Sequence, residues 1–252
     1  KTSAMSQRKR ETITNTTRIM EVDNGGNRKD GRGSNQIRGI NFEANVVGEA
    51  TGSAKLIQHQ NVVIASVHGP TLSKQAWRTY QDRAFLDVSI RWEKLDRRDN
   101  ADKLRALEDK TMECANNMID THNYPLSEIK IIITVINSDG SLFSSIIMAL
   151  QMALQLSGIA MKAHLCPLSF AVKGDKVVIN PTEEEELGET CVDVVINASE
   201  EGSVTICNQT SFVEFSVLQK CIEKTISYSK ALAQIERKFI EQTCMICAHQ
   251  LQ

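Results

Sequence analysis

The stretch from Ser138 to Gly158 contains the residues of this sequence best suited to binding chemistry. It opens with Asp139-Gly140, a dipeptide typical of tight turns, and continues through a run of apolar and small residues. The apolar positions recur every three or four residues around most of the circumference, which predicts a helix buried on more than one side and ended by Gly158. A glycine-containing turn at a helix N-terminus is a place where several folds hold phosphate, so this turn is the first candidate site.

Cysteines near the C-terminal end have the spacing of half a zinc site. Cys244 and Cys247 are followed by His249, but a structural zinc site needs four ligands, and the remaining cysteines contain no second close pair. Cysteines at a helix end that face a core or a partner are the more common arrangement. We therefore predict no metal site.

Aromatic and basic side chains lie together in another segment. Trp77 and Tyr80 stand beside Lys74 and Arg78, a mixture that can stack on single-stranded bases or be buried at a subunit interface. The sequence leaves both alternatives open. It contains no Gly-x-Ser-x-Gly segment, so a hydrolase with a Ser/His/Asp triad is not indicated.

Composition limits the class of protein. The 252 residues are enough for a sizeable core, and 41% hydrophobic with 24% charged residues is typical of a globular protein in water. The formal net charge of −2 gives no support to general nucleic-acid binding, so any RNA contact must come from a local basic patch. Seven cysteines, an odd number spread along the chain, indicate a reducing compartment. The longest apolar run, about 16 residues, is too short to span a bilayer.

The elements that must position the candidate residues follow from hydrophobic periodicity. Alternating apolar residues predict an antiparallel meander of strands before residue 93, with a tight turn at His59-Gln60 and a strand end at Gly69-Pro70. The β-branched run from Ile129 to Ile136 predicts a strand buried on both faces. The predicted strands cover residues 40–47, 53–58, 61–68, 84–92, 129–136, 165–172, 176–180, 191–197 and 203–208, and the predicted helices cover about 104–119, 139–158 and 213–249.

Strands followed by helices, in two successive halves, predict an α+β fold. Residues 1–28 contain few apolar side chains, and we expect them to form a disordered tail. Residues 29–252 are expected to form a single domain. The acidic residues Glu183 to Glu186, which follow Pro181-Thr182, indicate a solvated loop.

Six segments together give the chain a family resemblance. They are, in order, Lys29-Asp-Gly-Arg32 with Ile37-Arg38, Ala50-Thr-Gly-Ser-Ala54, residues 61–70, Tyr124-Pro125, the helix after Asp139, and Val178-Ile-Asn-Pro-Thr182 followed by acids. The set resembles the ribonuclease PH family, and most closely the non-catalytic core-ring subunits of the eukaryotic RNA exosome. This resemblance implies a ribonuclease PH-like α+β fold with antiparallel or mixed sheets and packed helices. It also implies a ring of six paired subunits around a central RNA channel.

Active members of this family carry out phosphorolysis, in which inorganic phosphate attacks the last phosphodiester of an RNA 3′ end and releases a nucleoside diphosphate. The reaction needs cations and turn amides to hold phosphate, and carboxylates to position a metal ion or a proton. In active relatives the turn reads Asp-Gly-Gly-Thr-Arg-Ser, and Leu142 and Phe143 occupy its Thr and Arg positions here. The two family Asp positions are Asn180 and Glu186. These degenerate positions predict a protein without a catalytic set or a cofactor.

Basic residues near the helix at 104–119 are the candidates for RNA contact. Arg105 keeps a plausible phosphate position at the start of this helix, and Arg97 and Arg98 precede it. The alternative is that they are solvated surface cations. The RNA-contact interpretation depends on the family's channel, which the resemblance places nearby.

We therefore expect a non-catalytic structural subunit of the RNA exosome ring that supports 3′-to-5′ RNA processing and degradation and lines the RNA path. The expected partners are other ribonuclease PH-like ring subunits, cap subunits with RNA-binding domains, an associated hydrolytic exoribonuclease and single-stranded RNA, with no membrane. The expected location is the nucleus, including the nucleolus, and the cytoplasm. Two alternatives stay open, namely an active phosphorolytic exoribonuclease with substitute residues and a free-standing RNA-binding module.

Overall fold

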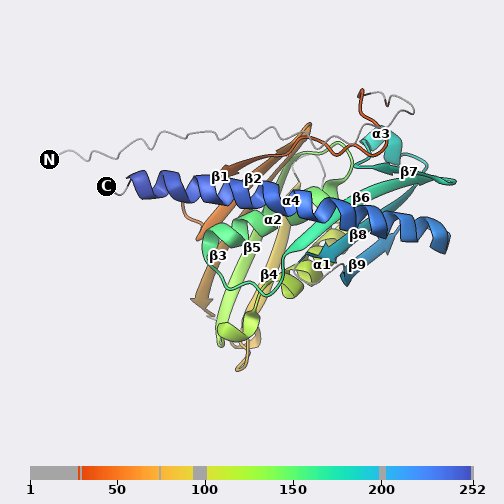
Figure 1. Ribbon diagram of the computed structural model, residues 1–252. Coiled ribbons are helices and arrows are strands. Elements are labelled where there is room, and N and C mark those ends of the chain that lie inside the picture. Colours follow the sequence, from red (N-terminus) through yellow and green to blue (C-terminus); the bar gives the residue numbers. More distant parts are fainter. Residues whose placement is uncertain (1–27, 29, 74, 93–100, 199–202, 251–252) are drawn as a thin grey trace.

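The computed structural model describes residues 28, 30–73, 75–92, 101–198 and 203–250. Within this part, the elements are β1 (Asn41–Ala44), β2 (Gly52–Gln58), β3 (Asn61–Leu72), β4 (Phe85–Trp92), α1 (Ala101–Met118), β5 (Ser127–Asn137), α2 (Leu142–Ser157), β6 (Leu165–Lys173), β7 (Lys176–Ile179), α3 (Glu183–Glu186), β8 (Thr190–Asn197), β9 (Ser203–Gln209) and α4 (Phe215–Gln250). The expected α+β class is confirmed (Figure 1). No helix in these ranges is long and apolar enough to cross a membrane.

The first sheet has five strands in the order β1-β2-β3-β5-β4. Its β2–β3 hairpin turns at His59-Gln60, as predicted, with His59 in the left-handed region at φ 57°. The predicted antiparallel meander is wrong beyond β3, because β5 lies between β3 and β4 and pairs with β4 in parallel. A parallel pair needs a long crossover connection, and α1 supplies it between these two strands.

Two further details of this sheet differ from the prediction. β3 does not end at Gly69-Pro70 but continues to Leu72, because an irregularity between His68 and Thr71 accommodates the proline, which has no N–H to donate. β5 is buried on one face only, since α1 and α2 pack on a single side of the sheet. Its fully buried side chains are Ile129, Ile131, Ile133 and Val135.

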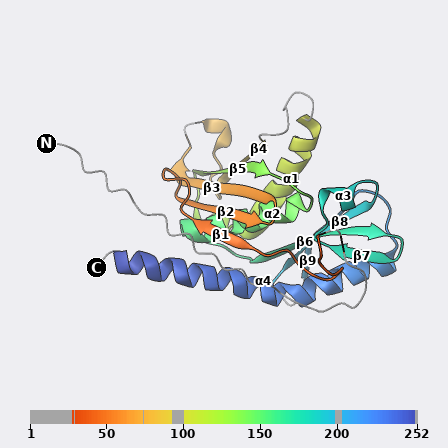
Figure 2. The same cartoon turned by 90° about the horizontal axis from the view of Figure 1, so that it is seen from above.

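The second sheet is antiparallel, in the order β7-β6-β8-β9. Both predicted hairpins are present, and pairing of β6 with β8 joins them. Figures 1 and 2 show α4 running along one side of the molecule past both sheets. It packs on β6 and β8, and farther along its Phe239 ring lies 5.4 Å from that of Phe42 in the β1 strand.

α2 is the central element, as its all-round apolar sequence predicts. It packs on β2 and β3 of the first sheet and on β6 of the second, and every residue from Phe143 to Leu154 is buried. The helix ends at Gly158, which takes the left-handed conformation at φ 71°. β2 approaches it so closely at Gly52 that a Cβ there would lie 2.4 Å from the backbone nitrogen of Ser157. Because α2 is held on several sides, its first turn has a fixed position.

Candidate functional site

The turn before α2 lies directly on the segment that follows β7. Gly140 has φ 69°, and a Cβ at this position would lie 2.5 Å from the carbonyl oxygen of Pro181 and 2.5 Å from the carbonyl carbon of Thr182. Ser141 begins the helix in the left-handed region, at φ 52°, and its hydroxyl donates to the carbonyl of Pro181 at 3.0 Å instead of capping the helix. The fold therefore brings together the two degenerate segments that the sequence placed about 40 residues apart.

Arg28 binds the chain where β7 ends. Its Nη1 donates to the carbonyl of Ile179 at 2.8 Å, its Nη2 donates to that of Asn180 at 2.9 Å, and its guanidinium forms an ion pair with Glu185. Burial raises the pKa of the Glu185 carboxyl, but its bonds to Arg28 and to the backbone N–H of Thr182 outweigh burial and leave the pKa below its usual value. Arg28 is the last residue of the segment expected to be a disordered tail, and here it contacts the folded domain. Residues 1–27 lie outside the described residues.

Arg32 and Arg38 continue this set of arginine contacts. Arg32 donates to the carbonyl of Asn180 at 3.1 Å, and Arg38 Nη2 donates to the carbonyls of Asp139 at 2.6 Å and Pro181 at 2.8 Å. Burial, and then the nearby Arg32, lower the pKa of Arg38 to about 10, so Arg38 is still cationic at neutral pH. The family motif at 29–38 thus holds the two segments in place, a role that the sequence alone did not assign.

Asn180 is fully buried and adopts a positive φ of 46°. Neither its side-chain oxygen nor its side-chain nitrogen has a hydrogen-bond partner among the described residues. A neutral amide cannot supply the negative charge that active relatives place at this position. Asparagine tolerates the left-handed region better than most residues, which fits the backbone geometry at this corner.

Glu186 lies at the N-terminus of α2, and its Oε1 accepts the backbone N–H of Ser141 at 2.5 Å. Burial raises the pKa of this carboxyl to about 7; the N–H of Ser141 and the charge of Arg38 lower it, while Asp193 and Glu183 raise it further. The predicted solvated loop is therefore wrong at this residue. Residues 183–186 form one helical turn instead, closed by a capping box at Thr182.

Leu142 and Phe143 make the first turn of α2 apolar. Leu142 is partly buried, and Phe143 is 5% exposed. The Nζ of Lys110, on α1, lies 5.8 Å from the centroid of the Phe143 ring. Lys110 is a cation near the degenerate turn that the sequence analysis did not select.

Asp193 of β8 is a second acid near this place that the sequence analysis missed. It accepts the hydroxyl of Ser169 at 2.7 Å, and burial raises its carboxyl pKa, against the opposing effects of Ser169 and Lys110. The available signal was an acidic residue in the middle of an otherwise apolar strand, since such a group is buried only where it has partners.

The predicted RNA-binding arginines are only partly described. Arg105 is exposed and is the fifth residue of α1. No hydrogen bond or ion pair in the described ranges joins it to the turn at 139–141. Arg97 and Arg98 lie outside the described residues, so their predicted role stays a prediction.

The residues at the degenerate turn do not fit a divalent metal ion. Asn180 is neutral, and Glu186 is already bonded to a backbone N–H. In the described part of the chain, no three His, Cys, Asp or Glu side chains are grouped to hold a metal. At the other end of the chain, Cys244 is exposed on α4, and the side chains of Cys247 and His249 lie outside the described set.

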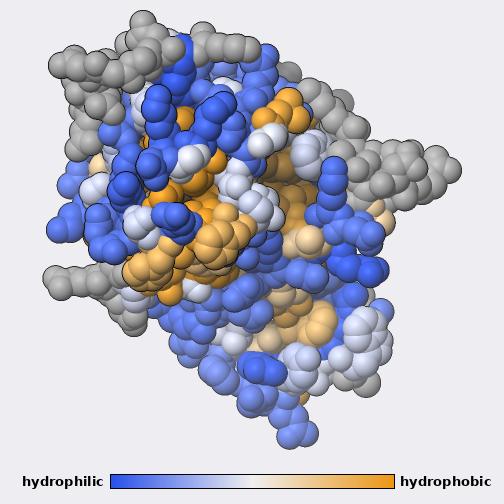
Figure 3. Space-filling model, turned by 90° about the vertical axis from the view of Figure 1, so that its right-hand side faces the viewer, coloured by the Kyte–Doolittle hydropathy of each residue, from blue (hydrophilic) through white to orange (hydrophobic). Residues whose placement is uncertain are grey.

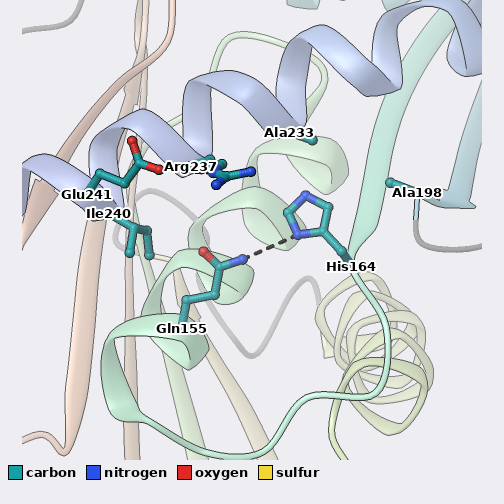
Figure 4. Close-up of a pocket in the computed structure, with 7 residues that line it drawn as sticks. All are labelled: Gln155, His164, Ala198, Ala233, Arg237, Ile240 and Glu241. Carbon is teal, nitrogen blue, oxygen red and sulfur yellow. Dashed lines mark hydrogen bonds and ion pairs between the residues drawn. The ribbon is translucent and has the colours of Figure 1, made fainter.

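A cavity of about 520 Å³ lies at the other end of α2. Figure 4 shows Gln155 and His164 on its wall, where Gln155 Nε2 lies 3.3 Å from His164 Nδ1, with Arg237 and Glu241 on the α4 side. Behind His164, the buried Glu236 accepts a hydrogen bond from Gln151 at 2.6 Å and lies 3.0 Å from the His164 ring nitrogen. Gln155 is 13 residues along the helix from Leu142, so the cavity is roughly 20 Å from the degenerate turn.

Sequence comparison matches both parts of the described fold. Residues 36–160 match domain 1 of the 3′ exoribonuclease family, and residues 165–227 match domain 2. The exosome complex component Rrp41 of Thermococcus kodakarensis is 25% identical over 237 residues, which cover 92% of this chain and 95% of the relative. Rrp41 of Thermoplasma volcanium is 25% identical over 233 residues, which cover 89% of this chain and 92% of the relative.

Solved structures share the same fold. Rice Rrp46 superposes with a TM-score of 0.76 at 21% identity, covering 85% of this chain and all of the other. A chain of an archaeal exosome core gives a TM-score of 0.65 at 16% identity, and the match covers 83% of this chain and 91% of the other. The ribonuclease PH-like fold implied by the resemblance is therefore confirmed. Because the two domain matches lie in order and span well over half of the chain, this protein belongs to the 3′ exoribonuclease family, with its two ribonuclease PH domains in succession.

Proposed function

We propose that this protein is a non-catalytic structural subunit of the RNA exosome ring, which supports 3′-to-5′ RNA processing and degradation and lines part of the RNA path. Membership of the complex is supported by the similarity to exosome component Rrp41 over more than 90% of the chain and by the fold shared with rice Rrp46. The absence of catalysis is supported by one observation above all. The turn where phosphorolysis requires Thr and Arg carries Leu142 and Phe143.

The chemistry explains why this observation matters. An arginine and a threonine at the turn would hold an attacking phosphate beside a polyanionic RNA, where charge repulsion otherwise keeps the two apart. Leu142 offers no hydrogen bond, and Phe143 is buried with no charge to offer. Asn180 adds no negative charge for a metal ion. We infer that inorganic phosphate is not activated at this site.

RNA contact is proposed at two places in the chain. One is the basic group Arg97, Arg98 and Arg105. The other is the aromatic segment after β3, where Trp77 is 67% exposed and Tyr80 40% exposed. Arg78 lies 4.6 Å from the Trp77 ring centroid and is already paired with Asp87 and Glu128. At this second place we therefore expect RNA bases to bind more by stacking on the aromatic rings than by attraction to the charge of Arg78.

An exposed apolar surface supports assembly with other subunits. Figure 3 shows orange patches on the end of the molecule where α3 and the first turns of α4 lie. Phe212 just before α4, Phe215 at its first residue and Leu187 just after α3 are 87%, 76% and 73% exposed. Large exposed apolar side chains of this kind are typical of protein interfaces. We propose ring subunits of the same family as the partners at this surface.

The further partners proposed are cap subunits with RNA-binding domains and an associated hydrolytic exoribonuclease. The proposed location is the nucleus, including the nucleolus, and the cytoplasm. These proposals rest on the family resemblance and on the composition of the chain.

A phosphorolysis assay tests the proposed lack of activity. The purified protein is incubated with a single-stranded RNA, Mg²⁺ and inorganic phosphate, and release of nucleoside diphosphates is measured. We expect no phosphate-dependent release. Release that a Glu186→Ala or Arg105→Ala change abolishes would instead establish the alternative, an active phosphorolytic exoribonuclease.

Native mass spectrometry after co-purification tests the structural role. A ring subunit is expected to appear in a complex with several other chains of its family. A stable monomer that binds RNA by itself would contradict the proposal and favour a free-standing RNA-binding module.

A further inference from the structure

The cavity at the far end of α2 is separate from the degenerate turn, and no part of the proposed function uses it. Its volume of about 520 Å³ falls within the range of about 300 to 1,000 Å³ that is typical of small-molecule pockets. Small residues leave this space open, because Ala233 of α4 and Ala198, just after β8, line it where longer side chains would fill it. Together with Ile240 they give the cavity an apolar wall.

A hydrogen-bond network behind the cavity fixes the orientation of His164. Gln151 Oε1 accepts the backbone N–H of Leu165 at 2.7 Å, so the Nε2 end of this amide contacts Glu236, at 2.6 Å. The same Glu236 oxygen lies 3.0 Å from His164 Nε2. A carboxylate only accepts hydrogen bonds, so the proton of the neutral imidazole lies on Nε2, and the two nitrogens are 3.3 Å apart because both donate to this oxygen. The other ring nitrogen, Nδ1, is therefore an acceptor.

Gln155 supplies the polar edge of the cavity. Its Nε2 lies 3.3 Å from His164 Nδ1 and donates one of its two hydrogens there (Figure 4). Its Oε1 has no hydrogen-bond partner among the residues that the structure describes. A ligand in the cavity therefore meets an acceptor and a donor side by side on one amide.

The charges around the cavity disfavour an ionic ligand. Arg237 and Glu241, both exposed, are paired with each other at 2.9 Å. Glu236 adds a second carboxylate behind His164, so a phosphate or carboxylate inside the cavity would meet more negative than positive charge. Glu236 already holds Gln151 and His164, which leaves little to attract a cation. The ligand that these groups fit is neutral, with an apolar body and with a donor and an acceptor adjacent on one edge.

We propose that this cavity binds one nucleobase, whose edge pairs with the Gln155 amide and whose apolar faces contact Ala233 and Ile240. Adenine matches this amide, because a glutamine side chain pairs with adenine N6 and N7 through one acceptor and one donor. The base belongs either to single-stranded RNA or to a free nucleoside. The choice of a nucleobase rests on the proposed contact with RNA, whereas the cavity and its polar edge do not depend on that proposal.

Adenosine titration tests the inference. The full-length wild type, Ala233→Leu and Gln155→Leu are titrated with adenosine at neutral pH, and binding is measured by calorimetry and by the NMR shifts of the His164 ring. Ala233→Leu is expected to weaken binding at least about tenfold, because its side chain fills the cavity. Gln155→Leu is expected to weaken it at least about fivefold, because it keeps a similar size but loses the donor and the acceptor.

Gln234→Leu is the matched control. It adds the same side chain one position farther along α4, at an exposed residue that does not line the cavity. We expect its adenosine affinity to stay within about twofold of the wild type. Ribose 5-phosphate, which lacks a base, is the control ligand and is expected not to shift the His164 signals.

Three results would overturn the inference. They are no adenosine binding by the wild type at millimolar concentration, equal affinities in the wild type and Ala233→Leu, and binding of ribose 5-phosphate as tight as that of adenosine. If Ala233→Leu does not fold, as judged by circular dichroism, Gln155→Leu decides the question, since an unchanged affinity in this variant contradicts the pairing with the base.

An oligoadenylate distinguishes the two sources of the base. If the base belongs to RNA, the oligoadenylate should bind at least about tenfold more tightly than adenosine, since neighbouring nucleotides add contacts outside the cavity, and Ala233→Leu should remove this gain. If a free nucleoside is the ligand, the oligoadenylate should bind no more tightly than adenosine.

The inference and the proposed function fail separately. Absence of adenosine binding overturns the inference and leaves the proposed place in the ring unaffected. A stable monomer, or phosphate-dependent RNA degradation, overturns the proposed function but does not alter the adenosine titration, because the cavity lies roughly 20 Å from the degenerate turn.

Discussion

Gly140 meets two requirements that no other residue meets together. Its φ of 69° lies in a region that L side chains rarely adopt, and the backbone of Pro181 and Thr182 occupies the space that a Cβ would need. Gly158 also has a positive φ, at 71°, but nothing lies within 4 Å of its missing Cβ. Comparing substitutions at the two glycines therefore distinguishes the cost of backbone strain from the cost of close packing.

Gly140→Ala should destabilise the protein by about 3 kcal/mol or more, since the new methyl group must push apart two backbone segments that Arg38 bonds to each other. Gly158→Ala should cost only about 1 kcal/mol, the strain of a left-handed alanine. Urea unfolding of both variants measures the difference. Equal losses would show that packing against 181–183 contributes nothing.

The raised pKa of Glu186 predicts a pH-dependent stability. The carboxyl has a pKa of about 7 in the folded protein against an ordinary value of 4.5, so the folded state binds this proton more tightly than the unfolded state. The stability from this proton is fully present below about pH 4.5 and is lost as the pH rises through about 7. Glu186→Gln does not titrate and lacks this loss.

We therefore expect the unfolding free energy of the wild type, relative to Glu186→Gln, to fall between pH 4.5 and pH 7 by up to about 3 kcal/mol, and by less where solvent reaches the carboxyl. Urea unfolding at several pH values measures it. Other titrating groups are common to both proteins and cancel in the difference. Parallel curves would show that the carboxyl is not perturbed.

Among the elements, α2 and α4 are joined by polar contacts as well as by packing. Glu236 of α4 is 3% exposed, accepts a hydrogen bond from Gln151 of α2, and lies against His164 at the start of β6. Gln151 also accepts the backbone N–H of Leu165 at 2.7 Å. A buried network of this kind fixes the rotation of α4 about its own axis, because only one orientation satisfies every group.

Glu236→Ala should lower the unfolding free energy by about 2 to 4 kcal/mol, because it removes the charged acceptor of the buried Gln151 amide. Glu241→Ala is the control on the same helix. Its ion pair with Arg237 is exposed and spaced four residues apart, so its loss should cost less than about 0.5 kcal/mol. Thermal and urea unfolding compare the two, and similar losses would contradict a special role for Glu236.

For the whole molecule, assembly is expected at the exposed apolar side chains Phe212 and Phe215, which lie just before α4 and at its first residue. The double change Phe212→Ser with Phe215→Ser should weaken association with the ring partners by more than about tenfold and leave the melting temperature of the isolated chain nearly unchanged, because both side chains are already exposed. Native mass spectrometry measures the assembled fraction.

Met245→Ser serves as the control for this surface. It removes a 63% exposed apolar side chain from the far end of the same helix. It should leave assembly unchanged if the surface at the start of α4 is the specific one. Equal weakening by both changes would indicate nonspecific apolar association instead.

The sequence by itself determined the local elements and the chemistry of the degenerate turn. The α2 helix, its end at Gly158, the hairpins and the loss of Thr, Arg and Asp at positions 142, 143 and 180 are all readable from it, because they depend on residue type and on neighbours a few positions away. The same local information placed β4 in a meander and buried β5 on both faces. Those errors arise because a repeating pattern of side chains does not say which strand lies beside which.

Only the tertiary structure decided what surrounds the turn. The carboxylate of Glu186 on Ser141, the arginines on the carbonyls of 179–181, and Asp193 with Lys110 nearby join residues that lie 45 or more positions apart or on different elements. Side chains on a charged segment such as 183–186 look solvated in the sequence, since solvation is the usual state of such residues. Here the backbone N–H of Ser141 binds the Glu186 carboxylate at the start of α2, where the side chain is only partly exposed and burial raises its pKa.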